Sequence, residues 1–200
     1  MNILLINYGT SNINSIYNSL KKIKKVKIFI NNFEKKHYDK IIFPGQGHIN
    51  NCINFVSKIK YLENYLKNSH ILGICIGYHI FFKNSEEDSK INCLNYINEN
   101  INLIAKNCCL NTINPNINWN KIKIIKFHKI LNNLPINFYQ YFMHSYSSIY
   151  KNQFFSYATS IFNNITFNSI VIKENKFLFQ FHPEKSGKNG LILLKNFLSL

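Results

Sequence analysis

Two short motifs in this sequence carry residue types that together can attack a carbonyl carbon. In the first, Cys75 lies between Gly73 and Gly77, directly after the apolar run 70–74. This pattern is typical of a nucleophile elbow, a sharp turn from a strand to a helix that holds its nucleophile in a strained backbone conformation. The two glycines remove the Cβ atoms that would collide in so tight a turn.

The second motif, Phe181-His182-Pro183-Glu184, supplies a histidine and, two residues later, a carboxylate. If residues 179–182 form a strand, His182 and Glu184 can lie on the same side, because strand side chains repeat every two residues. An imidazole can take the proton of the Cys75 thiol, and a carboxylate can orient the imidazole and stabilise its cation. Cys75, His182 and Glu184 therefore predict an enzyme that attacks a carbonyl carbon with sulfur.

Attack on a carboxamide also needs hydrogen-bond donors for the oxyanion that it creates. The backbone N–H of Ile76, immediately after the cysteine, is one candidate. The other is Gln46 in the turn Gly45-Gln46-Gly47, whose glycines allow backbone N–H groups to point into a site.

Each motif has a simpler explanation when it is taken alone. A cysteine between glycines can be a buried residue in a tight turn, and a histidine before proline is often only a turn residue. The order and spacing of the two motifs, with Pro44-Gly45 closing the preceding strand, favour the enzyme. His182 and Glu184 lack a third ligand at metal-binding spacing, so we expect neither a metal nor a cofactor.

The net charge of +15 does not by itself indicate binding to nucleic acid. The chain contains 34 Asn, 33 Ile and 24 Lys but no Arg, a bias that an A/T-rich genome would give to any protein. Arg is also the preferred residue for bidentate contacts to phosphates and bases. We therefore expect no nucleic-acid partner, although a basic surface would attract a phosphorylated substrate or an acidic partner.

Several features predict a cytoplasmic protein of one domain. A chain of 200 residues suits a single α/β domain, 1–200, with a sizeable core. No apolar run is long enough to cross a membrane. The N-terminus lacks a basic segment and a cleavage site, and five cysteines without a C-x-x-C pair fit reduced thiols.

The apolar pattern predicts strands that alternate with helices up to about residue 85, and mostly short strands after it. Strands are expected at 3–6, 26–30, 40–43 and 70–74, with helices at 13–23, 49–66 and 78–82. Later strands are expected at 91–94, 103–109, 122–127, 138–143, 154–157, 170–172 and 177–181, before a final helix at 191–198. This alternation predicts an α/β fold with a doubly wound, mostly parallel sheet and an added antiparallel part in the C-terminal half. Its functional turns are expected at the carboxyl ends of the strands.

The motifs around Cys75 and His182 resemble those of the class I (triad) glutamine amidotransferases. Further stretches resemble the glutaminase subunits of imidazole glycerol phosphate synthase within that superfamily. These stretches are 7–15 (NYGTSNINS), 44–47 (PGQG), 115–120 (PNINWN), 141–146 (YFMHSY) and 180–191 (QFHPEKSGKNGL). The last two separate these subunits from other triad amidotransferases, which usually share only the elbow and the H-P-E motif.

The resemblance implies a flavodoxin-like core and one half of a heterodimer. Cys75 would attack the side-chain amide of glutamine, release ammonia and leave a glutamyl thioester that water hydrolyses. The ammonia would pass to a (β/α)8-barrel cyclase, which makes imidazole glycerol phosphate and aminoimidazole carboxamide ribotide in histidine biosynthesis. Two alternatives remain, a triad amidotransferase that feeds a different synthase and a non-catalytic scaffold for the cyclase.

The same resemblance implies roles for further residues of this chain. Those expected to bind glutamine are Gly45, Gly47, His79, His144, Ser145 and Tyr146. Those expected to face the cyclase are Asn12, Trp119, Tyr141 and Lys185.

The chain departs from the family pattern at five positions, none of them in the triad. They are Asn7, Ser11, His79, Asn116 and Asn118. His79 stands where a glutamine often helps to bind the substrate, and an imidazole can still donate a hydrogen bond, but from a different position. We expect these departures to act on affinity and on coupling to the cyclase rather than on the chemistry.

Overall fold

The structure of this chain, a computed structural model, describes residues 1–9, 13–23, 25–34, 37–104, 114–151 and 154–200. In the first half, its elements are β1 (Asn2–Leu5), α1 (Ile13–Ile23), β2 (Lys27–Ile30), β3 (Lys40–Phe43), α2 (Ile49–Val56), α3 (Leu62–Asn68), β4 (His70–Ile74), α4 (Ile76–His79) and β5 (Phe82–Ser85). They are followed by β6 (Ile97–Leu103), β7 (Asn116–Ile124), the 3-10 helix η1 (Lys129–Leu131), β8 (Phe138–His144), β9 (Tyr146–Ser147), β10 (Ser156–Phe162), β11 (Ile165–Lys173), β12 (Lys176–Phe179), the 3-10 helix η2 (Pro183–Lys185) and α5 (Gly187–Ser199).

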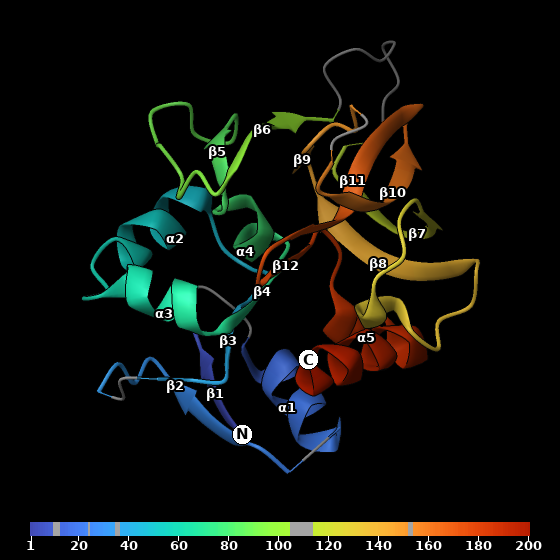
Figure 1. Cartoon of the computed structure of the whole chain (residues 1–200). Coiled ribbons are helices and arrows are strands. Elements are labelled where there is room, and N and C mark those ends of the chain that lie inside the picture. Colours follow the sequence, from blue (N-terminus) through green and yellow to red (C-terminus); the bar gives the residue numbers. More distant parts are fainter. Residues whose placement is uncertain (10–12, 24, 35–36, 105–113, 152–153) are drawn as a thin grey trace.

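A mixed sheet in the order β2-β1-β3-β4-β12-β11-β10-β7-β8 runs through the molecule (Figure 1). The five strands from β2 to β12 are parallel, and β11, β10, β7 and β8 continue the sheet in antiparallel fashion. A smaller sheet contains β5, β6 and β9. The predicted fold class, a mostly parallel sheet with an antiparallel part in the C-terminal half, is confirmed.

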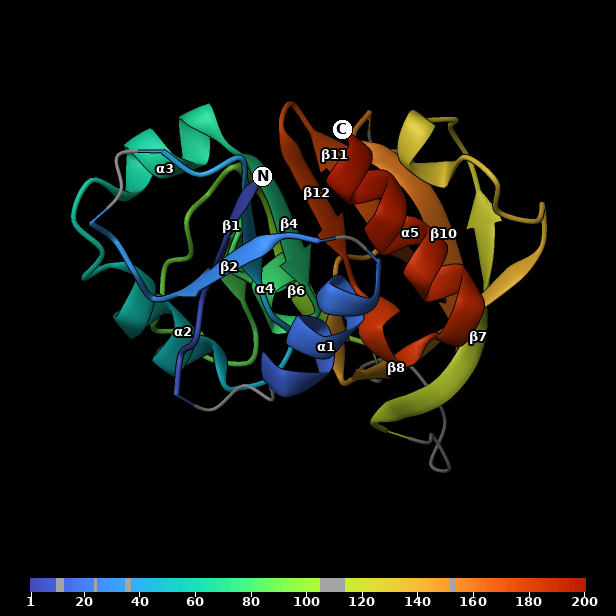
Figure 2. The ribbon, with the colours of Figure 1, turned by 90° about the horizontal axis from the view of Figure 1, so that it is seen from below.

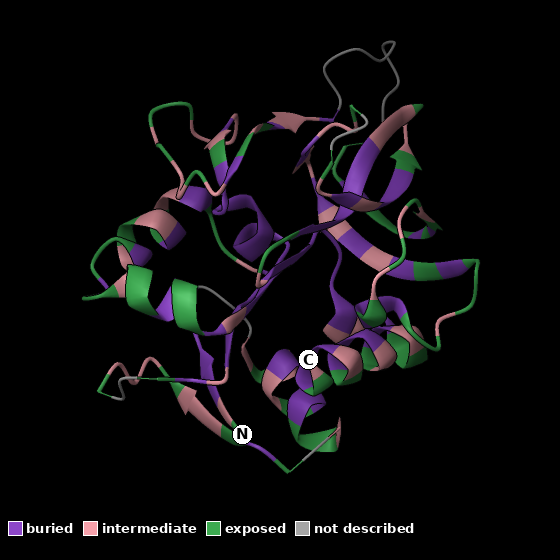
Figure 3. Cartoon of the chain, viewed as in Figure 1, coloured by how far each residue is buried: buried purple, intermediate pink, exposed green. Residues whose placement is uncertain are grey.

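Helices cover both faces of the parallel strands, and each face has its own apolar core. Ile42 and Leu72 face a core that includes side chains of α1 and α5. Their strand neighbours Ile41, Phe43 and Ile71 face a second core built with α2, α3 and α4. Figure 2 shows α1 and α5 packed together, and Figure 3 shows that the central strands are mostly buried. Burial on both faces explains why these strands are almost entirely apolar in sequence.

The prediction of one continuous helix at 49–66 is wrong, because the segment forms the two helices α2 and α3. The chain turns between α2 and α3, where Tyr61 has a left-handed backbone with φ of 60°. Both helices contribute to the same core, through Val56 and Leu66 among others, and Ile59 in the turn also packs there. The apolar pattern therefore continues across the break, and no glycine or proline marks it.

Two other predictions in the first hundred residues need correction. The helix predicted at 78–82 is the short α4, which ends at His79, and Phe82 already belongs to β5. All of the apolar residues in this run are buried, so the sequence shows no helical face. The strand predicted at 91–94 is only an isolated bridge between Asn84 and Asn92.

Most of the later strands lie near their predicted places but have different limits. The strand β7 begins at Asn116, earlier than predicted, and β10 and β11 extend further than the apolar runs indicate. Residues 105–109 of the strand predicted at 103–109 lie outside the described residues. The last strand ends at Phe179, so His182 lies in the turn beyond it and not in a strand.

The close packing of α5 against the turn at residues 183–185 gives a first prediction. A Cβ atom added at Gly190 would lie 1.9 Å from the carbonyl oxygen of Pro183. Gly190→Ala should therefore lower the free energy of unfolding by about 1–3 kcal/mol, the cost of overpacking, although alanine favours helices. Urea denaturation tests this. The exposed neighbour Lys188→Ala should change stability by less than about 0.5 kcal/mol. Equal stability of Gly190→Ala and the unmodified chain would contradict the packing described.

Candidate active site

Cys75 occupies a strained turn between β4 and α4. Its backbone has φ of 49° and ψ of −104°, a region that residues other than glycine rarely adopt. A Cβ atom at Gly77 would lie 2.1 Å from the carbonyl oxygen of Phe43, and one at Gly73 would lie 2.4 Å from that of Gly77. The turn is as tight as the two glycines predict, and strain of this kind is typical of functional sites.

His182 and Glu184 lie next to each other behind this turn. Nδ1 of His182 donates to Oε1 of Glu184 at 2.8 Å, and both side chains are shielded from solvent, with exposed fractions of 0% and 7%. They meet through the 3-10 turn η2 rather than along a strand. The ring of His182 also packs against Gly45, where a Cβ atom would lie 2.7 Å from Cε1.

The charge state of His182 depends on Cys75 and Glu184. Burial alone would lower the pKa of the imidazole, but the charge of the Cys75 sulfur, a hydrogen bond with it and the Glu184 carboxylate together raise that pKa well above its ordinary value. Nδ1 is occupied by Glu184, so the buried Nε2 is the nitrogen left to face Cys75. The interaction with the sulfur that raises the pKa is longer than a fully formed hydrogen bond, since Nε2 has no such partner among the described residues. The arrangement favours an imidazolium beside the sulfur.

Three backbone contacts bring the two motifs together. Strands β4 and β12 pair in parallel with Ile74 opposite Phe179. The Cys75 N–H donates to the Phe179 carbonyl at 2.8 Å, and the His182 N–H donates to the Tyr141 carbonyl at 2.9 Å. The site therefore lies at the carboxyl ends of parallel strands, where such sheets place ligands.

A cavity of about 390 Å³ opens above Cys75. Its lining contains every residue that the sequence assigns to the oxyanion or to glutamine, together with three others. The lining residues are Gly45, Gln46, Gly47, Cys75, Ile76, His79, Glu87, Met143, His144, Ser145 and Tyr146. The Cys75 thiol points towards the Met143 carbonyl, with Sγ at 3.6 Å from that oxygen.

The two histidines in the cavity wall are both neutral at physiological pH. Burial lowers the pKa of His79 to about 4 and that of His144 to about 3. Nδ1 of His144 donates to the Tyr146 carbonyl at 2.9 Å, and its Nε2 accepts from Asn116 at 3.1 Å. Nε2 of His79 lies 3.0 Å from Oε1 of the buried Gln180 side chain, so this nitrogen is engaged within the protein. The family departures His79 and Asn116 therefore both belong to the buried network around the site.

The residues expected to face a partner gather on one side of the antiparallel strands. Trp119 on β7 lies opposite Tyr141 on β8, with ring centroids 6.0 Å apart. Ser186 accepts from the Tyr141 N–H at 2.9 Å, which brings Lys185 close to them. Trp119 is 48% exposed. Asn12 lies outside the described residues.

The structure adds residues that the sequence analysis did not assign. Glu87 contributes the one carboxylate among the cavity-lining side chains. Gln180 lies fully buried beside Cys75, and its place two residues before His182 could have indicated this. Ser186 links the His182 carbonyl to β8. No local pattern marks Glu87, whose role emerges only from the folded chain.

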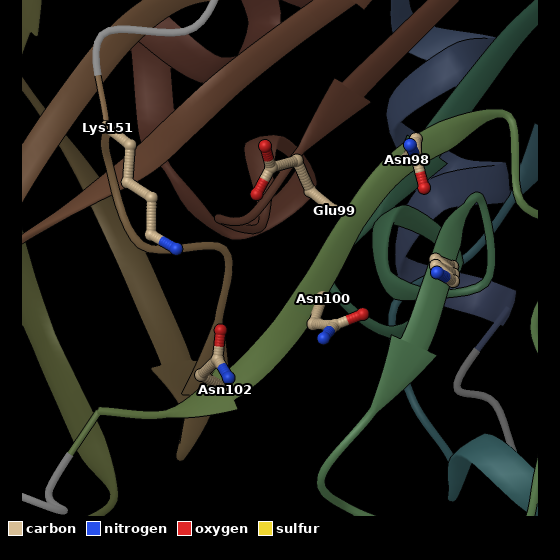
Figure 4. Close-up of a pocket in the computed structure, with 6 residues that line it drawn as sticks. Asn98, Glu99, Asn100, Asn102 and Lys151 are labelled. Carbon is tan, nitrogen blue, oxygen red and sulfur yellow. The ribbon is translucent and has the colours of Figure 1, made fainter.

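A second hollow, of about 350 Å³, lies away from Cys75 beside β6 (Figure 4). Its lining consists of the polar residues Lys83, Asn98, Glu99, Asn100, Asn102 and Lys151. Its described lining contains neither cysteine nor histidine, so it lacks the thiol and imidazole that the first cavity combines.

Within the described residues, no three His, Cys, Asp or Glu side chains are grouped to hold a metal ion. In the same part of the chain, no helix is long and apolar enough to span a membrane.

The raised pKa of His182 gives a prediction about stability and pH. A group whose pKa is higher in the folded state adds stability that is complete below its unfolded pKa of about 6.5 and is lost as pH rises through the folded value. Glu184→Gln should therefore cost about 1–3 kcal/mol of unfolding free energy at pH 5.5, and less at pH 9.5. Urea denaturation at several pH values measures this. A difference that grows with pH would contradict a charged His182 paired with Glu184.

Comparison with known proteins agrees with this geometry. A family model described as glutamine amidotransferase class-I matches residues 4–199. The chain is 33% identical over 210 residues to the imidazole glycerol phosphate synthase subunit HisH of Pelagibacter ubique, and the alignment covers 100% of both chains. It is 34% identical over 200 residues to the HisH subunit of Pyrococcus furiosus, with 99% of this chain and 98% of that protein covered.

Solved structures show the same fold at lower identity. PurLQS from Thermotoga maritima has a TM-score of 0.73 at 15% identity, covering 99% of this chain and 97% of that chain. The glutaminase domain of Trypanosoma brucei CTPS with bound acivicin has a TM-score of 0.66 at 13% identity, covering 100% of this chain and 94% of that one. The chain belongs to the class-I glutamine amidotransferase family and, within it, to the HisH subunits of imidazole glycerol phosphate synthase.

Proposed function

We propose that this protein is the glutaminase subunit of an imidazole glycerol phosphate synthase, with Cys75 as nucleophile and with His182 and Glu184 as its base and orienting carboxylate. One observation carries the proposal. The strained turn places Cys75 in the lining of the 390 Å³ cavity, and the buried His182–Glu184 pair lies directly behind it. This is the geometry that nucleophilic attack on a small carboxamide needs.

The first half of the reaction forms a thioester. The Cys75 sulfur attacks the side-chain carbonyl carbon of glutamine, and the oxygen gains negative charge. Backbone N–H groups of Ile76 and of the turn at Gln46 are the proposed donors to that oxygen, because both residues line the cavity beside Cys75. His182 gives its proton to the amide nitrogen, the carbon–nitrogen bond breaks, and ammonia leaves.

The second half releases glutamate. His182, now neutral, takes a proton from a water molecule, whose oxygen attacks the thioester carbon. The carbon–sulfur bond breaks and the proton returns to the Cys75–His182 pair. Throughout both halves, Glu184 holds Nδ1 of His182, so that Nε2 faces the sulfur.

Recognition of free glutamine requires a counter-charge for its α-ammonium group. Glu87 supplies the one carboxylate among the lining residues, and 15% of its side chain is exposed. Oε1 accepts from the Ile49 N–H at 3.3 Å and lies 3.6 Å from Nε2 of His48, so the carboxylate is held in place. The other residues proposed to complete the glutamine site around it are Gly45, Gly47, His79, His144, Ser145 and Tyr146.

The proposed partner is a (β/α)8-barrel cyclase that receives the ammonia and makes imidazole glycerol phosphate and aminoimidazole carboxamide ribotide. Trp119, Tyr141 and Lys185 support this, because the fold brings them together on a partly exposed face. Asn12, outside the described residues, is proposed to contact the same partner. We also propose that residues 1–200 act as a single amidotransferase domain.

Release of glutamate from glutamine, measured for the protein alone and with a barrel cyclase and its ribotide ligand, tests the function. Cys75→Ala and His182→Ala should each lower the rate in the complex by at least about 1000-fold, because the residues of a triad act as a unit. Cys93→Ala, which removes a free thiol outside the cavity, should keep most of the activity.

The remaining outcomes separate the alternatives. Turnover without activation by a bound cyclase would indicate an amidotransferase for a different synthase. Binding to the cyclase without any turnover would indicate a scaffold. Full activity in Cys75→Ala would overturn the proposed nucleophile.

Glu87 gives a separate prediction about affinity. Glu87→Gln keeps the size of the side chain but removes its charge, so KM for glutamine should rise about 10- to 100-fold with kcat nearly unchanged. The matched control is Glu86→Gln, whose carboxylate accepts from the Leu103 N–H and does not line the cavity. A rise in KM of equal size in both variants would contradict a specific role for Glu87.

A further inference from the structure

Gln180 is a buried amide that the proposed mechanism does not use. It follows β12 and points to the same side as His182, two residues later, while Phe179 and Phe181 stack on each other with ring centroids 5.1 Å apart. Both phenylalanines belong to the core on the α1 and α5 side. Although both residues lie beyond the end of β12, Gln180 and His182, each with an exposed fraction of 0%, lie on the side of Cys75.

The side chain of Gln180 bridges Cys75 and His79. Its Nε2 lies 4.0 Å from Sγ of Cys75, and its Oε1 lies 3.0 Å from Nε2 of His79. A buried amide without partners is costly, so these two contacts account for its place in the core.

The placement of the Gln180 amide puts its oxygen on His79 and its nitrogen towards the sulfur. Burial lowers the pKa of His79 to about 4, so the ring carries one N–H at neutral pH. An amide oxygen can only accept, so this placement requires the ring proton on Nε2 of His79. The amide N–H₂ group then faces the sulfur.

We propose that Gln180 is a positioning residue that donates an amide N–H to the Cys75 sulfur when the sulfur is negatively charged, and that His79 holds the amide in that direction. The inference rests on the proposed function only in taking Cys75 as the nucleophile. The sulfur then lies between two donors, the imidazolium of His182 and the amide of Gln180. His79, which lines the cavity at a position where the family resemblance implies contact with glutamine, also holds the Gln180 amide through Nε2.

Few other charged or titratable groups approach the sulfur. His182 follows β12 and is paired with Glu184. His144, at the end of β8, is neutral, and Glu87 is another residue of the cavity lining. Cys52, from α2, is neutral because burial raises its pKa to about 12. His182 is therefore the one cation in this set. Because the Gln180 amide is uncharged, the effect of removing it on the reactivity of Cys75 can be measured without changing the charge of the site.

The test is the pH dependence of Cys75 alkylation by iodoacetamide, followed by mass spectrometry of the peptide that contains Cys75. Gln180→Met keeps the volume but removes the donor. Its pH midpoint should rise by about half to one pH unit, and kcat for glutamine should fall about 3- to 10-fold with KM within about twofold. His79→Leu should shift the midpoint in the same direction, whereas His79→Gln, which keeps a donor for Oε1, should restore it.

Gln140→Met is the matched control, since Gln140 is also fully buried, but neither of its polar side-chain atoms has a hydrogen-bond partner among the described residues. Its alkylation midpoint should equal that of the unmodified protein, and thermal unfolding confirms that each variant is folded. An unchanged midpoint in folded Gln180→Met would overturn the inference, as would an equal shift in Gln140→Met. Alkylation does not require turnover, so this result is separate from the test of the proposed function, in which Cys75→Ala must lose glutaminase activity.

Discussion

The contact between two backbones at the start of α4 constrains the rest of the site. Gly77 approaches the Phe43 carbonyl so closely that a Cβ atom there would lie 2.1 Å from the oxygen. This approach lets the chain reverse directly after Cys75, whose φ of 49° is the result. Such a conformation costs on the order of 1–3 kcal/mol, and it persists only where the surroundings determine it. Here the surroundings are strands β3 and β4, each buried on both faces between two apolar cores.

The segment after β12 supplies the other half of the site by a simple alternation. Phenylalanines point into one core, and Gln180 and His182 point to the sulfur. The turn η2 then brings Glu184 back onto Nδ1 of His182. Polar side chains thus enter a region with few competing charges, where His79 and His144 are both held neutral by burial. In such surroundings a single donor or charge has a larger effect than it would in water.

The sequence predicted those features that depend on local patterns. The parallel strands, the elbow glycines and the positions of Cys75, His182 and Glu184 follow from short motifs and apolar runs. The break between α2 and α3 was missed because the apolar pattern continues through Tyr61. The early start of β7 was missed because Asn116 is polar yet buried, with His144 as its partner across the strand pair.

Long-range contacts account for the residues that sequence analysis left out. Glu87 reaches the cavity only because β5 and the following turn pack beside α2. The Glu87 carboxylate accepts a hydrogen bond from the N–H of Ile49, the first residue of that helix. Gln180 belongs to a recognised motif, but its contact with His79 joins residues 101 positions apart. No periodic or spacing rule describes such pairs, because they depend on the order of strands in the sheet.

The place of β12 in that order has a consequence for synthesis. This strand, which is synthesised well after β4, lies in the middle of the sheet between β4 and β11 and joins its parallel and antiparallel parts. Until it is made, β4 presents an unpaired apolar edge, which is a risk for association with other chains. Cys75 also lacks His182, its proposed base, and the Phe179 carbonyl that accepts from its backbone N–H. A nascent chain therefore carries the Cys75 thiol without the side chain and the backbone contact that complete the site. The site is complete only after β12 has paired with β4 and β11.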